Sequence, residues 1–167
     1  KDVEGDIAEI GVYKGGSATA ICEVRGDKIV HLFDTFTGLP KLGANDHDAD
    51  YFKGKYSASL DLVTDIMKSY PNVYMYKGLF PKTAIPIKNK KFSMVHLDLD
   101  VYQATLDALK FFWPRMSPGG IIITHDYEDD PNFPQGIVKA YATYFKGTQK
   151  IYSIAELGTR QGVVIKP

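Results

Sequence analysis

Short apolar runs alternate with amphipathic segments along most of this chain. The runs are bounded by turn residues such as Gly26-Asp27 and Pro71-Asn72, which is typical of buried strands. They predict strands at 6–10, 28–34, 73–76, 93–100 and 119–126. Apolar residues at helical spacing predict helices at 17–24, at about 59–69, around Leu106–Trp113 and at 135–145.

Strands that alternate with helices favour a parallel sheet that is covered on both faces. We therefore predict the α/β fold class, with a doubly wound, mostly parallel sheet and helices on both faces. The segments 150–155 and 161–166 predict a closing antiparallel strand pair at the C-terminus. The length of 167 residues suits one domain, which we place at 1–167.

Composition narrows the class of partner. The chain carries 20 Lys and Arg against 20 Asp and Glu, so its charge gives no reason to expect nucleic acid or an anionic membrane. A single cysteine excludes an internal disulfide and a cysteine-rich zinc site. Without a membrane-spanning run or a signal peptide, we expect a cytoplasmic protein. The chain opens at Lys1, almost directly in a strand, and we expect an N-terminal segment to be missing.

Two predicted loops, 35–57 and 128–134, are longer than a connection requires. Long loops in compact domains are usually functional or disordered. In doubly wound sheets, ligands bind beyond the carboxyl ends of the strands, which is where both loops would lie.

The first of these strand ends carries the motif Glu9-Ile-Gly-Val-Tyr-Lys-Gly-Gly-Ser17. Glycines at a strand-to-helix turn let the backbone approach a ligand and present amides at a helix N-terminus. The spacing is neither that of a dinucleotide turn nor that of a P-loop. Glu9 would repel a pyrophosphate but suits the ammonium of an amino-acid moiety; a plain tight turn is the alternative.

Asp34 ends the second strand, 23 residues after Gly11. An acidic residue at about this distance accepts hydrogen bonds from ribose hydroxyls in dinucleotide folds. The alternative is an Asp that only starts a turn. Together with the glycine turn, this position favours a ribose-containing ligand.

A second group of acidic residues ends two later strands. Asp98 and Asp100 end one of them, and His125 and Asp126 end the next. If the strands are neighbours, these side chains meet, and carboxylates with water suit Mg²⁺, Mn²⁺ or Ca²⁺. Since alternate strand residues point the same way, Asp98 and Asp100 would share a face. The alternative is that they are solvated, or that Asp100 caps the next helix.

The remaining strand histidines have a different environment. His31 and His96 fall inside apolar strands, where histidines are more often hydrogen-bonded core residues than ligands. We therefore predict structural roles for both.

Five segments resemble, in chain order, the macrocin O-methyltransferase family, whose members are class I S-adenosylmethionine-dependent enzymes that methylate sugar hydroxyls on natural products. The segments are Glu9-Ile-Gly-Val-Tyr-Lys-Gly-Gly-Ser17, Phe33-Asp-Thr-Phe-Thr-Gly-Leu-Pro40, Lys77-Gly-Leu-Phe-Pro-Lys-Thr83, His96-Leu-Asp-Leu-Asp-Val-Tyr102 and Gly119-Gly-Ile-Ile-Ile-Thr-His-Asp-Tyr127. The resemblance implies a Rossmann-like class I methyltransferase fold and an O-methyltransferase acting on a sugar or a glycosylated metabolite.

The resemblance also implies roles for individual residues. The turn from Glu9 to Ser17 would hold the methionine part of the cofactor, Asp34 the ribose, and Lys77-Gly78 the adenosine, while Phe36 and the loop after it would close over the site. The implied cofactor-binding residues are Glu9, Gly11, Gly15, Gly16, Ser17, Asp34, Thr35, Phe36, Lys77 and Gly78.

A divalent metal is implied at Asp98, His125 and Asp126, with Mg²⁺ first and Mn²⁺ second. The implied catalytic residues are Asp98, Asp100 and His125. Family members often carry a second Asp where this chain has His125, and imidazole favours softer metals. Members also have an N-terminal helical segment that helps to build an oligomer and that this chain lacks, so a homo-oligomer is an open expectation.

Two other readings stay open. A D-x-D pair also occurs in metal-dependent glycosyltransferases, which bind a nucleotide-sugar diphosphate but have no use for Glu9 beside the glycines. A non-catalytic module that binds the cofactor or a partner is the other. No loop residue identifies the acceptor.

Overall fold

The computed structural model describes residues 3–46, 51–128, 136–156 and 159–167. The sheet contains the strands β1 (Asp6–Ile10), β2 (Val30–Asp34), β3 (Val73–Lys77), β4 (Phe92–Leu97), β5 (Met116–His125), β6 (Ile151–Glu156) and β7 (Thr159–Ile165). The helices are α1 (Gly16–Val24), α2 (Leu60–Met67), α3 (Tyr102–Phe112) and α4 (Gly136–Phe145), with short 3₁₀ helices η1 (Lys82–Ile87) and η2 (Trp113–Arg115).

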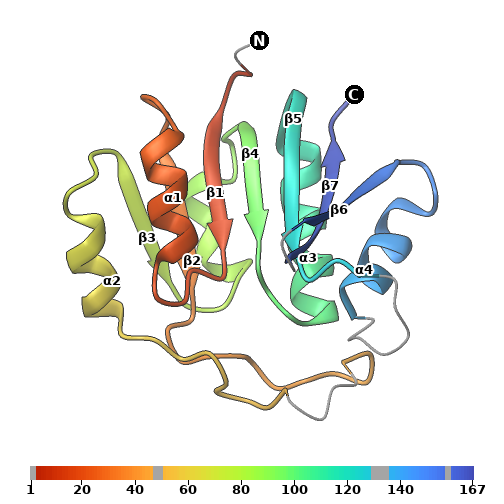
Figure 1. Ribbon diagram of the computed structural model, residues 1–167, viewed down its shortest axis with the longest axis horizontal. Coiled ribbons are helices and arrows are strands. Elements are labelled where there is room, and N and C mark those ends of the chain that lie inside the picture. The colour runs from red at the N-terminus through yellow and green to blue at the C-terminus, as the bar shows by residue number, and fades with distance from the viewer. Residues whose placement is uncertain (1–2, 47–50, 129–135, 157–158) are drawn as a thin grey trace.

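The strands form one sheet in the order β3-β2-β1-β4-β5-β7-β6. The first five run parallel, and β7 pairs antiparallel with both β5 and β6. The predicted sheet and closing strand pair are therefore confirmed. Because β1 and β4 are central neighbours, the strand ends that carry the glycine turn and the acidic residues lie side by side at one edge (Figure 1).

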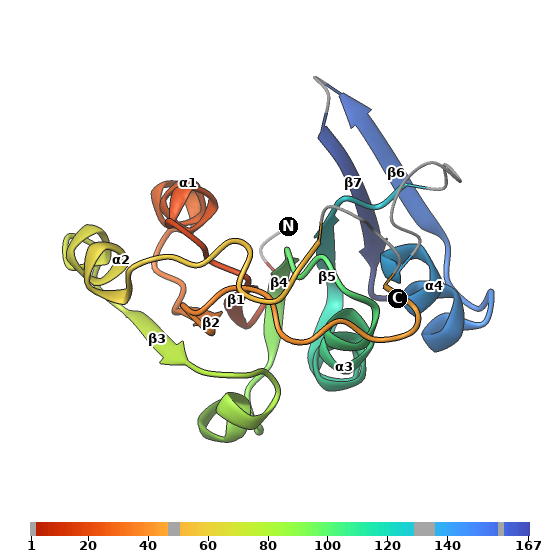
Figure 2. The same ribbon diagram turned by 90° about the horizontal axis from the view of Figure 1, so that it is seen from below.

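Two hydrophobic cores hold the helices against the sheet. Helices α1 and α2 pack on one face through Ala18, Ile21, Val63 and Met67, which cluster with Leu32 and other strand residues. Helices η1, α3 and α4 lie on the other face, as Figure 2 shows from below. They contribute to a larger buried cluster. Alternate residues of β1 and β2 supply the two cores, as the pleat requires, whereas β5 and β7 contribute buried residues to the larger cluster.

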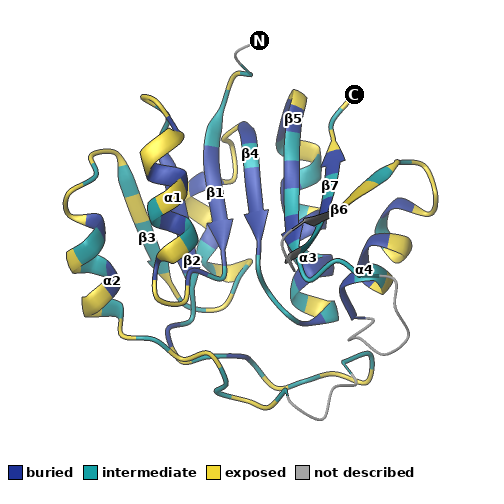
Figure 3. Cartoon of the chain, viewed as in Figure 1, coloured by how far each residue is buried: buried dark blue, intermediate teal, exposed yellow. Residues whose placement is uncertain are grey.

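The helices cover the two faces unequally. Helices α1 and α2 lie over β1 to β3, while no described helix covers the same face over β5 and β7 (Figures 1 and 3). Tyr152, Ile154 and Ile165 on the closing strands are accordingly about half exposed. The prediction of helices on both faces thus holds for one half of the sheet more fully than for the other.

Several element boundaries differ from the sequence prediction, and one short helix was not predicted. β4 ends at Leu97, so Asp98 and Asp100 belong to a loop and do not continue the strand. Asp100 takes a left-handed backbone (φ 61°), which breaks the alternation expected for a strand. β5 begins at Met116, three residues before the predicted start, and η1 was not predicted, because Pro86 within it argues against a helix.

The long loop after β2 passes beneath the carboxyl ends of the central strands (Figure 1). Residues 47–50 of that loop, and all but the first residue of the segment predicted at 128–134, lie outside the described residues. None of the described helices is both long and apolar enough to cross a membrane.

Candidate functional site

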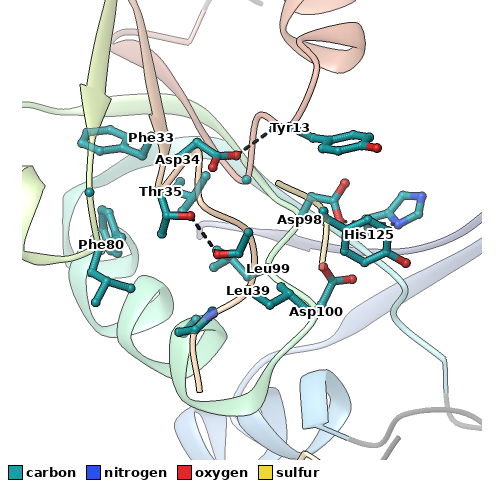
Figure 4. A pocket seen from close by; sticks show the side chains of 18 of the residues that line it. Tyr13, Phe33, Asp34, Thr35, Leu39, Phe80, Asp98, Leu99, Asp100 and His125 are labelled. Atoms are coloured by element: carbon teal, nitrogen blue, oxygen red, sulfur yellow. Dashed lines mark hydrogen bonds and ion pairs between the residues drawn. The ribbon is translucent and has the colours of Figure 1, made fainter. Parts of the chain in front are cut away.

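A cavity of about 260 Å³ opens at the carboxyl ends of β1, β2, β4 and β5, where the parallel sheet predicts a ligand. It is lined by Ile10, Gly11, Tyr13, Phe33, Asp34, Thr35, Gly38, Leu39, Pro40, Tyr56, Gly78, Leu79, Phe80, Asp98, Leu99, Asp100, Ala104, His125 and Asp126. Figure 4 shows two unlike ends, with Phe33 and Phe80 at one and Asp98 and His125 at the other.

The apolar end is built from aromatic and aliphatic side chains. The rings of Phe33 and Phe80 meet edge to face, with centroids 5.4 Å apart. Leu79 and Leu99 complete this wall beside Gly78. Gly78 adopts φ 135°, and a Cβ there would lie 2.9 Å from Thr83 Cγ2, so a side chain at this position would crowd the wall. Such a surface suits a flat, heteroaromatic group.

The glycine turn after β1 is shaped by Gly11 and Gly15, which both have positive φ angles. A Cβ on Gly11 would lie 1.8 Å from the carbonyl oxygen of Asp98, so only glycine lets the β1 and β4 ends approach this closely. Gly15 precedes the first residue of α1, and no side chain caps that helix. The first amides of α1 therefore lack an intrahelical or side-chain acceptor and can bind an anionic group.

The carboxylate of Asp34 already accepts three hydrogen bonds from backbone N–H groups. Its Oδ2 accepts hydrogen bonds from the backbone N–H groups of Val12 and Tyr13, both at 2.8 Å. Its Oδ1 accepts the N–H of Phe36 at 2.6 Å. The carboxylate thus ties the glycine turn to the end of β2 while it also lines the cavity. Its contact with a ribose stays a prediction.

The implied cofactor residues divide into two groups. Gly11, Asp34, Thr35 and Gly78 line the cavity. The others do not line it: Glu9, Gly15, Gly16, Ser17, Phe36 and Lys77.

Glu9 and Phe36 lie in the interior rather than on the cavity wall. Glu9 is fully buried, its Oε1 lies 2.9 Å from His96 Nδ1, and its Oε2 has no hydrogen-bond partner. Phe36 is buried in the core under α1 and α2. The predicted contact of Glu9 with an ammonium group and the closing role of Phe36 stay predictions.

The acidic end gathers residues from the loop after β4 and from the end of β5. Asp98, His125 and Asp126 each present a donor atom, and these three atoms lie within 4.8 Å of one another. His125 Nδ1 is 3.0 Å from Asp126 Oδ1 and 3.7 Å from Asp98 Oδ1. Asp100 stands apart from this triangle, lines the same cavity, and accepts the hydroxyl of Tyr51 at 3.1 Å.

The charges at this end shift the pKa values strongly. Contact with the Asp126 carboxylate raises the pKa of His125 to about 9 against the opposing effect of burial, and the charge of Asp98 adds to the rise. Burial is the main cause that raises the pKa of Asp98. Burial, followed by the charges of Asp98 and Asp126, raises the pKa of Asp100 to about 7. Crowded carboxylates of this kind favour a bound cation.

The donor set fits a divalent cation. His125 Nδ1 is buried and makes no well-angled hydrogen bond, even though two carboxylates face it. Two carboxylate oxygens and one imidazole nitrogen suit Mn²⁺ at least as well as Mg²⁺, since nitrogen ligands favour the softer ion.

Sequence reasoning missed two tyrosines on the cavity wall. Tyr13 follows the glycine turn, Tyr56 comes from the long loop, and their rings meet edge to face with centroids 5.9 Å apart. Both have left-handed backbones (φ 50° and 62°), which is uncommon for an aromatic residue. Residues with such strained backbones cluster at functional sites. The abundance of tyrosine, with eleven in the chain, indicated that some loop tyrosines could line a sugar site, but it did not single out these two.

Comparison with known proteins identifies the class first. The chain matches the crystal structure of CalS11, a calicheamicin methyltransferase also described as a TDP-rhamnose 3'-O-methyltransferase, with a TM-score of 0.83 at 18% identity over 98% of this chain and 73% of that one. The fold is that of a class I methyltransferase.

The sequence comparisons then identify the family. The model of the macrocin O-methyltransferase family (TylF) matches residues 1–159. The tetracenomycin rhamnosyl 4'-O-methyltransferase of Streptomyces olivaceus is 33% identical over 77% of this chain and 55% of its own length. The mycinamicin III 3''-O-methyltransferase of Micromonospora griseorubida is 34% identical over 75% and 56%. The chain thus spans about half the length of these relatives. It belongs to the macrocin O-methyltransferase family.

Proposed function

We propose that this protein transfers a methyl group from S-adenosylmethionine to a hydroxyl of a sugar or of a glycosylated natural product. The observation that carries the proposal is the two-ended cavity, which places an aromatic wall and an acidic cluster on opposite sides of one space. Family membership supports the same reaction, since the two curated relatives are named as methyltransferases of rhamnosyl-tetracenomycin and of mycinamicin III.

The aromatic end suits the adenine of the cofactor. Leu79, Phe80 and Leu99 offer apolar surface to a flat ring, and Gly78 leaves room at the wall. The fully buried Phe33 packs edge to face against Phe80 and supports this surface from behind. The turn around Gly11 and the free N-terminus of α1 suit the carboxylate of the methionine part. The Gly11 turn lies directly against the Asp98 backbone, so the residues that would hold the methionine part adjoin the acidic end of the cavity.

The acidic end suits the acceptor and a divalent cation. Asp98, His125 and Asp126 would hold the cation. When bound, the cation supplies positive charge that lowers the pKa of a chelated sugar hydroxyl. The rings of Tyr13 and Tyr56, each about 40% exposed, offer an apolar face beside the acids against which a sugar ring can pack.

The reaction then needs only positioning and one proton transfer. S-adenosylmethionine supplies, when bound, a methyl group that moves in line from sulfur to oxygen, and the sulfur keeps the bonding pair as a neutral thioether. Asp100 is the residue that we assign as the acceptor of the hydroxyl proton. Burial is the main cause that raises the pKa of this carboxyl, which favours a proton acceptor near neutral pH.

A calorimetric titration tests the class of enzyme. We expect S-adenosylhomocysteine to bind with a dissociation constant in the micromolar range, whereas UDP and NAD⁺ should not bind. Metal-dependent binding of UDP without binding of S-adenosylhomocysteine would support the glycosyltransferase alternative. Binding of S-adenosylhomocysteine without methylation of any sugar hydroxyl, TDP-rhamnose included, would support the non-catalytic alternative.

The identity of the cation is tested by exchanging its nitrogen ligand. We expect wild type to bind Mn²⁺ more tightly than Mg²⁺, and His125→Asp to reduce this preference by about tenfold, since carboxylate oxygen suits Mg²⁺. An unchanged preference would remove His125 from the proposed site.

A further inference from the structure

The long loop after β2 is closed on itself near its two ends. Leu39 N–H donates to Lys55 O at 2.8 Å, and Gly54 N–H donates to Leu39 O at 3.0 Å. A Cβ on Gly38 would lie 2.3 Å from Gly54 O, so this neck requires glycine. The described parts of the loop, residues 35–46 and 51–57, therefore meet at this neck next to the cavity.

Asp46, from beyond the neck, caps a helix that lies far away in the sequence. Its Oδ1 accepts the backbone N–H of Tyr102, the first residue of α3, at 2.6 Å, and its Oδ2 accepts the N–H of Gly43 at 2.9 Å. The residue at the N-cap position of α3 is Val101, which has no side-chain acceptor. A carboxylate in this place satisfies an otherwise free amide and interacts favourably with the helix dipole.

The start of α4 packs tightly against the carboxylate of Asp46 and the amide that it caps. A Cβ on Gly136, at the start of α4, would lie 3.1 Å from both Asp46 Oδ1 and the Tyr102 nitrogen. Next to Asp46, the amide oxygen of Asn45 accepts a hydrogen bond from Lys139 Nζ at 2.5 Å. The loop thus contacts the N-terminal turns of both α3 and α4.

The same loop also touches the acidic end of the cavity. Tyr51 donates its hydroxyl hydrogen to Asp100 Oδ1 at 3.1 Å. Asp100 has a left-handed backbone, which costs free energy in a residue other than glycine. Its conformation is therefore fixed by neighbours, namely Tyr51 on the side chain and Asp46 on the amide of Tyr102 two residues later.

We infer that Asp46 and Tyr51 are positioning residues through which the long loop fixes Asp100. The inference rests on the proposed function, in which Asp100 receives the proton of the acceptor hydroxyl. A proton acceptor must be held in hydrogen-bonding range of the reacting group, and a prearranged carboxylate avoids the entropy cost of ordering it at each turnover. Neither residue lines the cofactor cavity, so their effect on the reaction passes through Asp100.

Hydrogen exchange in the ligand-free protein tests the inference without a substrate. We expect Asp46→Ala to speed amide exchange in the segment 98–105 by about tenfold, because the loss of a helix cap costs about that factor in local stability. Asp46→Asn, whose amide oxygen can still accept the Tyr102 N–H, should stay within about threefold of wild type. Tyr51→Phe should give an increase of about threefold, since the Tyr102 amide keeps its acceptor.

Matched controls separate this role from general loss of structure. Asp107→Ala removes an acid from the same helix, and Tyr152→Phe removes a hydroxyl from the far edge of the sheet; both should exchange as wild type does. S-adenosylhomocysteine should bind to all five variants within about twofold of wild type. Unchanged exchange at 98–105 in Asp46→Ala, or an equal loss in Asp46→Asn, would overturn the inference. Failure of wild type to bind S-adenosylhomocysteine would overturn the proposed function instead.

Discussion

Two clusters of histidine and carboxylate residues occupy opposite ends of the same sheet. At the start of β1 and β2, His31 Nε2 lies 3.0 Å from Asp6 Oδ2, and His31 Nδ1 lies 3.0 Å from the hydroxyl of Tyr76. At the other end, His125 faces Asp98 and Asp126. The first cluster is buried, with a His31 side chain only 4% exposed, whereas the His125 side chain is 34% exposed beside a cavity.

The two clusters differ in the hydrogen-bond partners and in the pKa of their histidine. Both ring nitrogens of His31 have partners, and its ring packs on Tyr74, Tyr76 and Phe92. Burial, the largest cause, lowers the pKa of His31, although Asp6 opposes it. His125 instead has a raised pKa and a buried nitrogen without a well-formed hydrogen bond. A satisfied cluster stabilises the fold, while an unsatisfied one beside a cavity is ready for a ligand.

The largest expected effect comes from a substitution in the cluster around His125. Asp98→Asn should lower turnover by at least about 100-fold. In the proposed function Asp98 holds the cation, and it lines the same cavity as the proton acceptor Asp100. The affinity for S-adenosylhomocysteine, measured by calorimetry, should stay within about twofold. Asp107→Asn on α3 serves as the control. A parallel loss of cofactor binding would show that Asp98 has a structural role.

A substitution in the cluster around His31 should change the stability of the fold rather than the binding of a ligand. His31→Ala leaves a cavity and an unpaired hydroxyl on Tyr76, and it leaves the Asp6 carboxylate with only its ion pair to Lys90. We therefore expect a loss of about 2–4 kcal/mol in the free energy of unfolding. His125→Ala, at a half-exposed position, should cost less than about 1 kcal/mol. Urea unfolding of both variants gives the comparison. Equal losses would mean that the two clusters do not differ in the way we describe.

The smallest expected effect is on the pH dependence of the stability of the fold. Because burial lowers the pKa of His31 in the folded state, the unfolded chain binds the proton more readily. The stability that depends on neutral His31 is therefore present above the unfolded pKa of about 6.5 and is lost as the pH falls through the lower folded value. The urea midpoint of wild type should drop more between pH 7.5 and pH 5.5 than that of His31→Phe. Identical pH dependence in the two proteins would contradict this assignment.

Much of this architecture is predictable from local pattern. The apolar runs predicted five strands and the closing pair was predicted beside them, while the alternation with helices predicted a mostly parallel sheet but not the strand order. These features are predictable because strand length, turn residues and helical spacing are local properties. The structural roles predicted for His31 and His96 are confirmed, since both are buried and have partners. Asp98, His125 and Asp126 do meet, because the strands that precede them are neighbours.

Other features depend on contacts between distant segments. The sequence predicted that Asp98 and Asp100 share one strand face, but β4 ends before them and Asp100 turns away from the triangle. Gly11 was interpreted as room for a ligand, whereas the tightest contact of its missing Cβ is with the Asp98 backbone. The Asp46 cap on α3 joins residues 56 positions apart, and no local pattern contains that information.

The sequence by itself determined the main helices and strands within a few residues, the mostly parallel sheet and the family, since these follow from periodicity and from contiguous motifs. Only the tertiary structure decided which carboxylates meet, which oxygens of Asp34 are already used, and which loop residues hold Asp100. The physical reason is that hydrogen bonding and burial of a side chain depend on the neighbours that strand order and register bring to it, and these neighbours come from anywhere in the chain.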